Sequence, residues 1–420
     1  MKKIKLIFIL SWDLSPRYIS HFCIDELSEE FDVEYWDLSK ISVPPTETSN
    51  PAIRPYVKHF NSLSKLKKEV ALLPNDTLGV IYLDRSYKMY EVHKIISSKI
   101  HYGIFMYFNK SMQEDQQSRA EAQAKQKNEP KITPKLKRKS ILQKVKSSVY
   151  SIEWIYLLFK FIRYRGDERF AALVNARKSR AIQEMYKGWI DINNREDCEY
   201  RTQHPDYDLV LSVGESTYKG EPYILYIDSY WPLHSMWIDR VPGLDFKTLA
   251  EPYYKSMNRF FDRLENEYGY KVKIAVHPAA AYENDPYGGR ELIKYKSVEL
   301  TRDCWAVCLH ASNSANFIAY YDKPMAIITN DVLDSVGDDI CYGSLAGLTQ
   351  ALADKLKLDV VNVDHCDKVS NIFRKLEPKV REDYVNKYLV DLSNPVPTSE
   401  LLKKHFHSIY NRIYVEQQNK

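Results

Sequence analysis

Residues 272–330 read VKIAVHPAAAYENDPYGGRELIKYKSVELTRDCWAVCLHASNSANFIAYYDKPMAIITN, and this stretch decides the fold that we expect. Two short apolar runs, 272–276 and 305–309, have the length and composition of buried parallel strands, and each stops abruptly at polar residues. A third apolar run, 325–329, follows Lys323-Pro324. Because ligands of open α/β sheets bind just beyond the carboxyl ends of such strands, the stretch is predicted to contain a ligand site.

The same alternation of strands and helices continues on both sides of this stretch. Before it, strands are predicted at residues 5–10, 33–36, 78–83, 103–108, 208–213 and 223–227, and helices at 16–30, 87–98 and 246–268. Within and after it, helices are predicted at 316–321, 345–356, 369–392 and 399–417, and a strand at 359–363. This alternation predicts parallel sheets in an α/β fold. No Gly-x-Gly-x-x-Gly follows the first strand, which argues against a dinucleotide-binding fold there.

The length of 420 residues exceeds one ordinary core, so the sequence predicts an α/β protein with two Rossmann-like lobes. The N-terminal lobe is expected to comprise residues 1–112, a basic helical insertion at 113–190, and its last strands at 191–235. A C-terminal ligand-binding lobe is expected at 236–398, followed at 399–420 by a helix that returns to the N-terminal lobe.

Positive charge is concentrated in the predicted insertion. Residues 119–180 hold 17 Lys/Arg and 5 Asp/Glu, a net charge of +12, whereas the whole chain carries +4. Two interpretations stay open: solvated helices with an aromatic face packed on the lobe, or an interfacial segment that binds anionic lipid headgroups. No helix-turn-helix or ribonucleoprotein motif is present, so nucleic acid is not an expected partner.

The compartment follows from the apolar runs and the cysteines. No run reaches the ~18–20 apolar residues of a transmembrane helix, and the first ten residues read as a strand rather than a signal peptide. The six cysteines lack the paired CxxC spacing of a zinc site, so free thiols are expected. We therefore expect a cytoplasmic protein that the basic segment can hold peripherally on the inner membrane.

Polar motifs at the strand ends supply the candidate chemistry. His277-Pro278 ends one strand, and because proline cannot continue a central ladder, the imidazole is expected above the sheet, where it can donate to a phosphate. After the strand at 305–309, His310 precedes Ser312 and Ser314, either of which can cap the next helix and complete an anion site. Each motif alone is also compatible with an ordinary strand end or helix cap.

Two further motifs complete the set. Between the strand-end motifs, Gly288 and Gly289 allow close backbone approach, and Arg290 offers a bidentate fork for phosphate or carboxylate. Asp228 directly follows the strand at 223–227, where burial can adapt its carboxylate to act as a base, although capping of the next segment is equally compatible. The predicted catalytic residues are Asp228, with Glu215 in reserve; the donor residues are His277, Pro278, Gly288, Gly289, Arg290, His310, Ser312 and Ser314; the acceptor residues are Tyr230, Trp231 and His234.

The order of these motifs resembles a family of bacterial surface-polysaccharide (lipopolysaccharide or capsule) biosynthesis glycosyltransferases of the two-Rossmann GT-B type. The resemblance rests on Asp-x-Tyr-x-Pro-x-His at 228–234, Phe-Phe-Asp-x-Leu-Glu at 260–265, His-Pro at 277–278, Tyr-Gly-Gly-Arg at 287–290 and His-x-Ser-x-Ser at 310–314, and continues to Lys323-Pro324. The layout is also similar to that of bacterial sialyltransferases of this fold. That similarity implies that Asp228 is the general base, that His277 contacts the donor phosphate, and that Ser312 and Ser314 contact the phosphate or nucleotide.

The chain departs from the sialyltransferase pattern in two places. Asp228 is followed by Ser229-Tyr230 rather than by a second acid and a glycine, and Asn313 separates the two serines. The donor therefore stays open between a CMP-linked acidic sugar, such as Kdo or a nonulosonate, and a UDP or GDP sugar.

Together these features predict a glycosyltransferase that moves a sugar from a nucleotide-sugar donor to a bacterial surface glycan or lipid-linked acceptor. The donor is expected in the C-terminal lobe and the acceptor in the N-terminal lobe near Asp228. No cofactor or metal is expected, because no Asp-x-Asp motif suited to a divalent cation is present. Two alternatives remain: a non-catalytic membrane-surface or polysaccharide-assembly protein that uses the basic segment, and an epimerase that shares the donor site.

Overall fold

The computed structural model describes residues 3–41, 54–82, 90–106, 173–174, 200–234, 245–336, 345–411 and 414. The chain divides into two compact units. Unit 1 contains the described residues up to Pro205 and from Val396 onward, and unit 2 contains those from Asp206 to Pro395.

Unit 1 is built on a parallel sheet. Its strands are β1 (Lys5–Leu10), β2 (Asp32–Asp37), β3 (Val57–His59), β4 (Leu78–Tyr82), β5 (His101–Met106), β6 (Leu173–Val174) and β7 (Tyr200–Arg201). They lie in the order β3-β2-β1-β4-β5-β6-β7, which turns back at β1 as the Rossmann order does. Neighbouring strands pair in parallel throughout.

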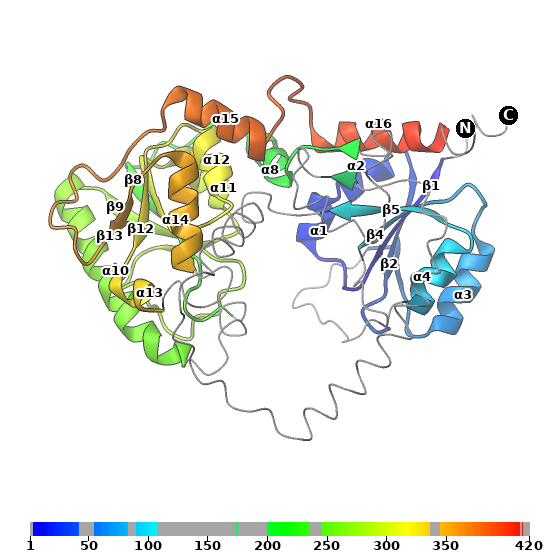
Figure 1. Cartoon of the computed structure of the whole chain (residues 1–420), viewed down its shortest axis with the longest axis horizontal. Coiled ribbons are helices and arrows are strands. Elements are labelled where there is room, and N and C mark those ends of the chain that lie inside the picture. Colours follow the sequence, from blue (N-terminus) through cyan, green and yellow to red (C-terminus); the bar gives the residue numbers. More distant parts are fainter. Residues whose placement is uncertain are drawn as a thin grey trace, which may run out of the picture. The chain divides into compact units, whose positions relative to one another are not determined.

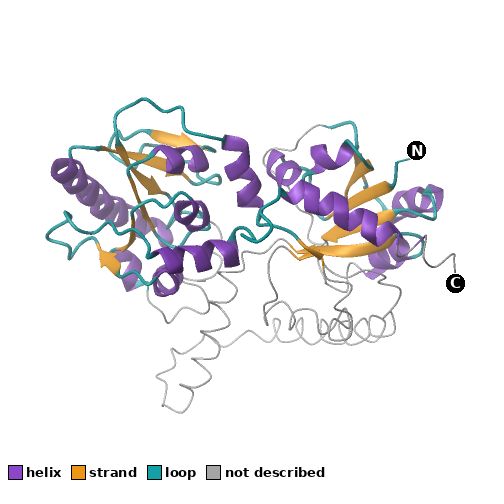
Figure 2. Ribbon diagram, turned by 90° about the horizontal axis from the view of Figure 1, so that it is seen from above, coloured by secondary structure: helices purple, strands orange, loops and turns teal. Residues whose placement is uncertain are grey.

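Helices cover both faces of this first sheet (Figure 2). They are α1 (Pro16–His21), α2 (Ile24–Ser28), α3 (Leu63–Leu72), α4 (Tyr90–Ser97) and α16 (Thr398–Tyr410). Successive side chains of β1 point to opposite faces, so Leu6 and Phe8 pack with α1, α2 and α16, while Ile7 and Ile9 pack with α3 and α4. The last helix thus belongs to unit 1: Phe406 of α16 lies 5.8 Å from the ring of Phe31, and Lys403 pairs with Glu29 at 3.0 Å.

Unit 2 contains a second parallel sheet. Its strands are β8 (Tyr223–Ile227), β9 (Lys271–Val276), β10 (Leu292–Lys294), β11 (Ala306–Leu309), β12 (Met325–Thr329) and β13 (Val360–Asn362). The order β10-β9-β8-β11-β12-β13, counted from β8, is the Rossmann order 3-2-1-4-5-6. The predicted fold class, α/β with two Rossmann-like lobes, is therefore confirmed. Two parallel-sheet α/β units in one chain are consistent with a GT-B fold.

The helices of unit 2 also lie on both faces of their sheet (Figure 1). They are α8 (Pro205–Val213), α10 (Phe246–Tyr268), α11 (Ser297–Asp303), α12 (Ala315–Tyr320), α13 (Asp331–Ser335), α14 (Leu345–Leu356) and α15 (Pro378–Tyr388). Tyr226 of β8 packs with α10, whereas its neighbours Leu225 and Ile227 pack with α11, α12 and α15. β8 is buried on both sides because it lies in the middle of the sheet.

The structure corrects two predictions on the way into unit 2. Residues 208–213, predicted as a strand, belong to helix α8, which has proline at its first position and Asp206 and Asp208 in its first turn, as helix starts prefer. Residues 223–227, predicted as the last strand of the N-terminal lobe, form β8, the central strand of the second sheet. The predicted lobe boundary at 235/236 is therefore wrong, and the chain enters unit 2 at Asp206.

Other differences are smaller. The helix predicted at 16–30 is two helices, separated at Cys23, whose φ of 51° is left-handed and interrupts the helix. The helix predicted at 369–392 is shorter, α15, because Arg374 forms a β-bridge with Met325. Of the basic insertion predicted at 113–190, only Leu173–Val174 is described, as β6 of the first sheet; the rest lies outside the described residues.

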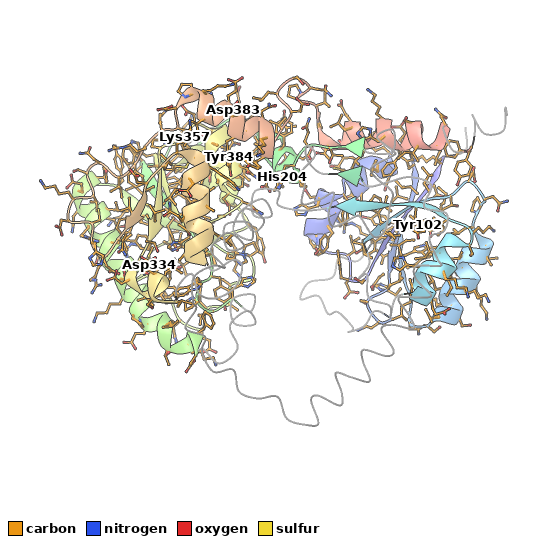
Figure 3. The ribbon with its side chains drawn as sticks, viewed as in Figure 1. Tyr102, His204, Asp334, Lys357, Asp383 and Tyr384 are labelled. Carbon is orange, nitrogen blue, oxygen red and sulfur yellow. The ribbon has the colours of Figure 1, made fainter. Side chains whose placement is uncertain are left out.

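The carboxyl ends of all six strands of the second sheet face the same way. Figure 3 marks both edges of that sheet: Asp334 lies just after β12, at the carboxyl edge, and Lys357 just before β13, at the amino edge. Asp228, His277 and His310 directly follow β8, β9 and β11, so they lie at the carboxyl edge. In a Rossmann-ordered sheet this is the edge that receives ligands, at the point where the strand order reverses.

The packing of α16 makes a prediction about stability. Phe406 is fully buried, so Phe406→Ala is expected to lower the unfolding free energy of unit 1 by about 3–5 kcal/mol. Leu72→Ala is the control, because Leu72 is 79% exposed and its loss is expected to cost little. Urea unfolding followed by circular dichroism measures both; equal losses would show that α16 does not pack as described.

Candidate functional site

A buried carboxylate holds the carboxyl edge of β8 and β9 together. Asp228 is only 3% exposed, and its Oδ1 accepts the backbone N–H of Tyr230 (2.7 Å) and the hydroxyl of Tyr287 (2.9 Å). Its Oδ2 accepts the hydroxyl of Tyr282 (2.7 Å) and the backbone N–H of His277 (3.2 Å). A carboxylate offers about four lone-pair positions, and here each oxygen already accepts two donors.

This geometry does not fit the predicted role of Asp228 as the general base. Burial raises the pKa of Asp228 above its usual value, and the four hydrogen bonds act in the opposite direction. A base must turn a lone pair toward the proton that it accepts, and all four positions are in use. Asp228 instead fixes the loops that follow β8 and β9.

The reserve carboxylate, Glu215, does not lie beside Asp228. The guanidinium of Arg302, at the end of α11, donates to the backbone oxygen of Glu215 (3.1 Å), and α11 leads directly into the start of β11. Glu215 is exposed and lies at the amino edge of the sheet, opposite Asp228. The structure therefore does not bring Glu215 to the Asp228 site, because the segment before it is a helix rather than a strand that ends at the carboxyl edge.

His277 and Pro278 lie where the sequence predicted them. β9 ends at Val276, His277 is half-buried, and Pro278 is exposed. The Nδ1 of His277 accepts the backbone N–H of Ala279 (3.1 Å), so the neutral ring carries its proton on Nε2. The edge of β9 thus holds an imidazole whose Nε2–H is a hydrogen-bond donor.

His310 is part of the core rather than of a ligand surface. Its Nδ1 lies 2.6 Å from the carbonyl oxygen of Ile328, and its Nε2 lies 2.8 Å from the hydroxyl of Tyr253. Burial lowers the pKa of His310 to about 4, so the ring is neutral. Nδ1 therefore donates to the carbonyl, Nε2 accepts from Tyr253, and Tyr253 accepts from Tyr226 at 2.9 Å. The prediction that His310 binds the donor is wrong, because both ring nitrogens have partners.

Arg290 is likewise occupied. Its Nη2 pairs with Asp262 (2.6 Å) and Glu265 (3.1 Å) of α10, its Nη1 donates to Asn258 (3.1 Å), and its side chain is 8% exposed. The fork that was predicted to bind phosphate instead ties the β9–β10 loop to α10. The neighbouring Gly288 and Gly289 have φ of 67° and 82°, so they serve the turn that brings Arg290 back to that helix.

The two serines after β11 are half-buried at the start of α12. Ser312 Oγ accepts the backbone N–H of Ser314 (3.2 Å), while Ser314 occupies the N-cap position without a side-chain cap bond. β8 separates β11 from β9, so these serines and the His277 motif follow strands that are not neighbours in the sheet. Their predicted contact with a donor stays a prediction.

The predicted acceptor residues separate into two groups. Trp231 is 2% exposed and packs at 4.9 Å from the ring of Tyr253, so it belongs to the core and cannot stack on a sugar. Tyr230 and His234 are half-buried, and the His234 ring lies 4.9 Å from that of His277. Residues predicted for donor and for acceptor therefore lie side by side in unit 2.

Sequence reasoning missed the tyrosines that complete this site. Tyr282 and Tyr287, both from the β9–β10 loop, donate to Asp228, and Tyr287 is fully buried. Tyr287 stands in the Tyr-Gly-Gly-Arg motif and the chain has an unusual 32 tyrosines, but neither signal indicates that Tyr282 and Tyr287 meet Asp228.

Unit 1 contains a group with metal-ligand chemistry. Among the described residues, one set of three side chains has ligand atoms that all lie within 4.8 Å of one another: Asp13, Asp37 and His59. These residues end or follow β1, β2 and β3, and His59 Nδ1 lies 2.6 Å from Asp37 Oδ2.

The described part of the chain contains no helix long and apolar enough to span a membrane.

No protein-family model and no curated protein matches the chain. Several solved structures have a similar backbone trace. The UDP-GlcNAc 2-epimerase from Methanocaldococcus jannaschii has a TM-score of 0.44 at 11% identity, covering 96% of this chain and 100% of that one. The Arabidopsis thaliana UGT89C1 complexed with UDP-L-rhamnose has a TM-score of 0.43 at 10% identity, covering 98% of this chain and 100% of that one. The wall teichoic acid polymerase TagF has a TM-score of 0.44 at 13% identity, covering 98% of this chain and 90% of that one. All three scores lie below 0.5, so we draw no functional conclusion from them.

The saturated carboxylate gives a first test of the site. Asp228→Asn keeps the shape but turns one acceptor into a donor that faces another donor, so a loss of about 1–3 kcal/mol in unfolding free energy is expected. Glu215→Gln is the matched control, because that side chain is exposed. Urea unfolding measures both, and an Asp228→Asn variant as stable as its control would contradict the four-bond arrangement.

The buried imidazole gives a second test. The folded pKa of His310, about 4, lies below the unfolded value near 6.5, so below pH 6.5 the unfolded state binds a proton that the folded state does not. Stability is therefore complete above pH 6.5 and falls by up to about 3 kcal/mol as the pH drops to 4. His310→Gln lacks this titration, so the stability difference between wild type and variant should shrink over that range. Parallel curves of unfolding free energy against pH for wild type and variant would show that His310 is not a buried, neutral imidazole in the folded state.

Proposed function

We propose that this protein is a glycosyltransferase that takes a sugar from a nucleotide-sugar donor, and that unit 2 binds the donor. The observation that supports this most is the edge of β8 and β9: an imidazole with an Nε2–H donor next to half-buried tyrosine and histidine rings, beside the point where a Rossmann-ordered sheet reverses. A phosphate needs hydrogen-bond donors, and the sugar attached to it needs ring surfaces.

The proposed chemistry assigns His277 to the leaving phosphate. As the bond between the anomeric carbon and the phosphate oxygen breaks, negative charge develops on the phosphate, and an N–H donor fixed at that place stabilises it. Ala279 and Asp228 fix His277 through its Nδ1 and its backbone N–H, so the ring needs little reorientation. Asp228 orients this group and does not take the acceptor's proton.

The finer features of the proposal come from the sequence. The acceptor is a surface glycan or a lipid-linked intermediate of a bacterium, transfer needs no metal, and the basic segment at 119–180 holds the protein on anionic lipid. That segment lies outside the described residues. The Asp13, Asp37 and His59 group gives the metal question a direct test: chelator treatment that abolishes transfer would refute metal independence.

Ligand binding tests the proposal. A thermal-shift screen with CMP, UDP, GDP and their sugar conjugates is expected to raise Tm with one nucleotide class. With that ligand, His277→Ala is expected to raise Kd by roughly 10- to 100-fold in calorimetry, because a hydrogen bond to a charged group is lost.

His407→Ala serves as the control, because His407 is a partly exposed histidine on α16 of unit 1. An unchanged Kd in His277→Ala would remove the assigned phosphate ligand, and a protein that binds none of these nucleotides would overturn the proposed function. Product analysis without an acceptor separates transfer from epimerisation: a changed sugar on the intact nucleotide would identify an epimerase.

A further inference from the structure

Four half-buried rings form a continuous row at the edge of β8 and β9, and we call them the edge rings: His277, His234, Tyr230 and Tyr282. Ring centroids lie 4.9 Å apart between His277 and His234, 6.2 Å between His234 and Tyr230, and 5.2 Å between Tyr230 and Tyr282. The row thus begins at the imidazole assigned to the phosphate and runs away from it.

Hydrogen bonds to Asp228 hold the Tyr230 and Tyr282 end of the row in place. Tyr230 has φ of 53°, a left-handed conformation that is uncommon for a residue other than glycine and costs about 1–3 kcal/mol. Its N–H donates to Asp228 (2.7 Å), and its carbonyl oxygen accepts the N–H groups of Leu233 and His234 at 2.9 Å each. Tyr282 is fixed by its hydroxyl bond to the same Asp228. Strain that the surroundings maintain in this way is typical of ligand sites.

The angles between the rings indicate what they receive. Neighbouring rings lie at 82°, 73° and 81° to each other, so no two neighbours form a parallel pair that could hold a planar base between them. A surface of faces, edges and polar tips instead suits a puckered ring with hydroxyl groups at its rim.

The charges of the described residues at this edge disfavour an acidic sugar. The buried Asp228 carboxylate contacts Tyr282 and the backbone of Tyr230, and burial lowers the pKa of His234, which favours its neutral form. Of the nearby cations in the described residues, Arg290 is paired with Asp262 and Glu265, and Lys294 donates to the carbonyl oxygen of Ala280. A second carboxylate, on the ligand, would face Asp228 without a described counter-charge.

We propose that the edge rings bind the glycosyl group of the donor and that this group is a neutral sugar. The inference rests on the proposed function: the sugar is bonded directly to the phosphate that His277 contacts, so it is the part of the donor that reaches the neighbouring rings. The nucleoside is attached at the other end of the phosphate.

Calorimetry separates the sugar from the nucleotide. For wild type and variants, Kd is measured for UDP against UDP-N-acetylglucosamine, GDP against GDP-mannose, and CMP against CMP-N-acetylneuraminate. Tyr230→Asn and His234→Leu are expected to raise the Kd of the neutral conjugate roughly fivefold or more and to leave that of the bare nucleotide within about twofold. His277→Ala raises both. Asparagine at 230 tolerates the left-handed backbone, so it removes the ring without adding strain.

Tyr295→Asn is the matched control, because Tyr295 is also a tyrosine of unit 2 with positive φ (61°) but is 74% exposed and outside the edge rings. The inference is overturned if Tyr230→Asn and His234→Leu weaken nucleotide and conjugate by the same factor, if they weaken neither, or if the acidic conjugate binds more tightly than bare CMP. Failure of the proposed function looks different, since wild type would then bind no nucleotide at all.

Discussion

The arrangement of unit 2 at the carboxyl edge of its sheet depends on the hydrogen bonds of one buried carboxylate. Asp228 follows the central strand and collects donors from three places: its own loop, the end of β9, and the β9–β10 loop. A buried charge is tolerable only when its lone pairs are satisfied, so each of these segments must stay where its donor reaches the carboxylate. The position of His277, the strained conformation of Tyr230 and the orientation of Tyr282 follow from that requirement.

A second buried polar chain supports the first from the neighbouring strand. Tyr226, directly under Asp228 on β8, donates to Tyr253 of α10, which donates to His310, which donates to the carbonyl oxygen of Ile328 at the end of β12. This chain connects β8, α10, β11 and β12 near the carboxyl edge of the sheet. Every member has a partner, so the chain gives the edge a defined geometry at little cost from unsatisfied groups.

The sequence predicts the elements of unit 2 well and their chemistry less well. The helix at 246–268 and the strand at 325–329 have their predicted bounds. The helix keeps apolar residues at helical spacing over 23 residues, and the strand is a short buried run without interruption. The run at 208–213 is apolar at four of its six positions, a composition that suits a short buried strand as well as the helix α8, which buries Tyr207 and Val210. β8 was placed in the wrong lobe because sheet membership depends on contacts with β9 and β11, which come later in the chain. For the site, strand ends located Asp228, His277 and His310, but no local pattern shows whether such a side chain points into the core or toward a ligand.

The charged groups at this edge are paired within the protein, and this pairing determines what kind of ligand the edge could bind. Arg290, the cation best shaped for a phosphate, is neutralised by two carboxylates of α10, and Asp228 is surrounded by donors. Neither ion is left to pair with a ligand, so the edge offers neutral donors and ring surfaces instead of charges. An N–H donor on His277 can still bind a phosphate, because its strength comes from fixed direction and partial burial rather than from a full charge. In the proposed function, a site of this composition distinguishes donors by the shape and hydroxyl pattern of the sugar rather than by its charge, and the buried carboxylate that orients the rings also disfavours an acidic sugar.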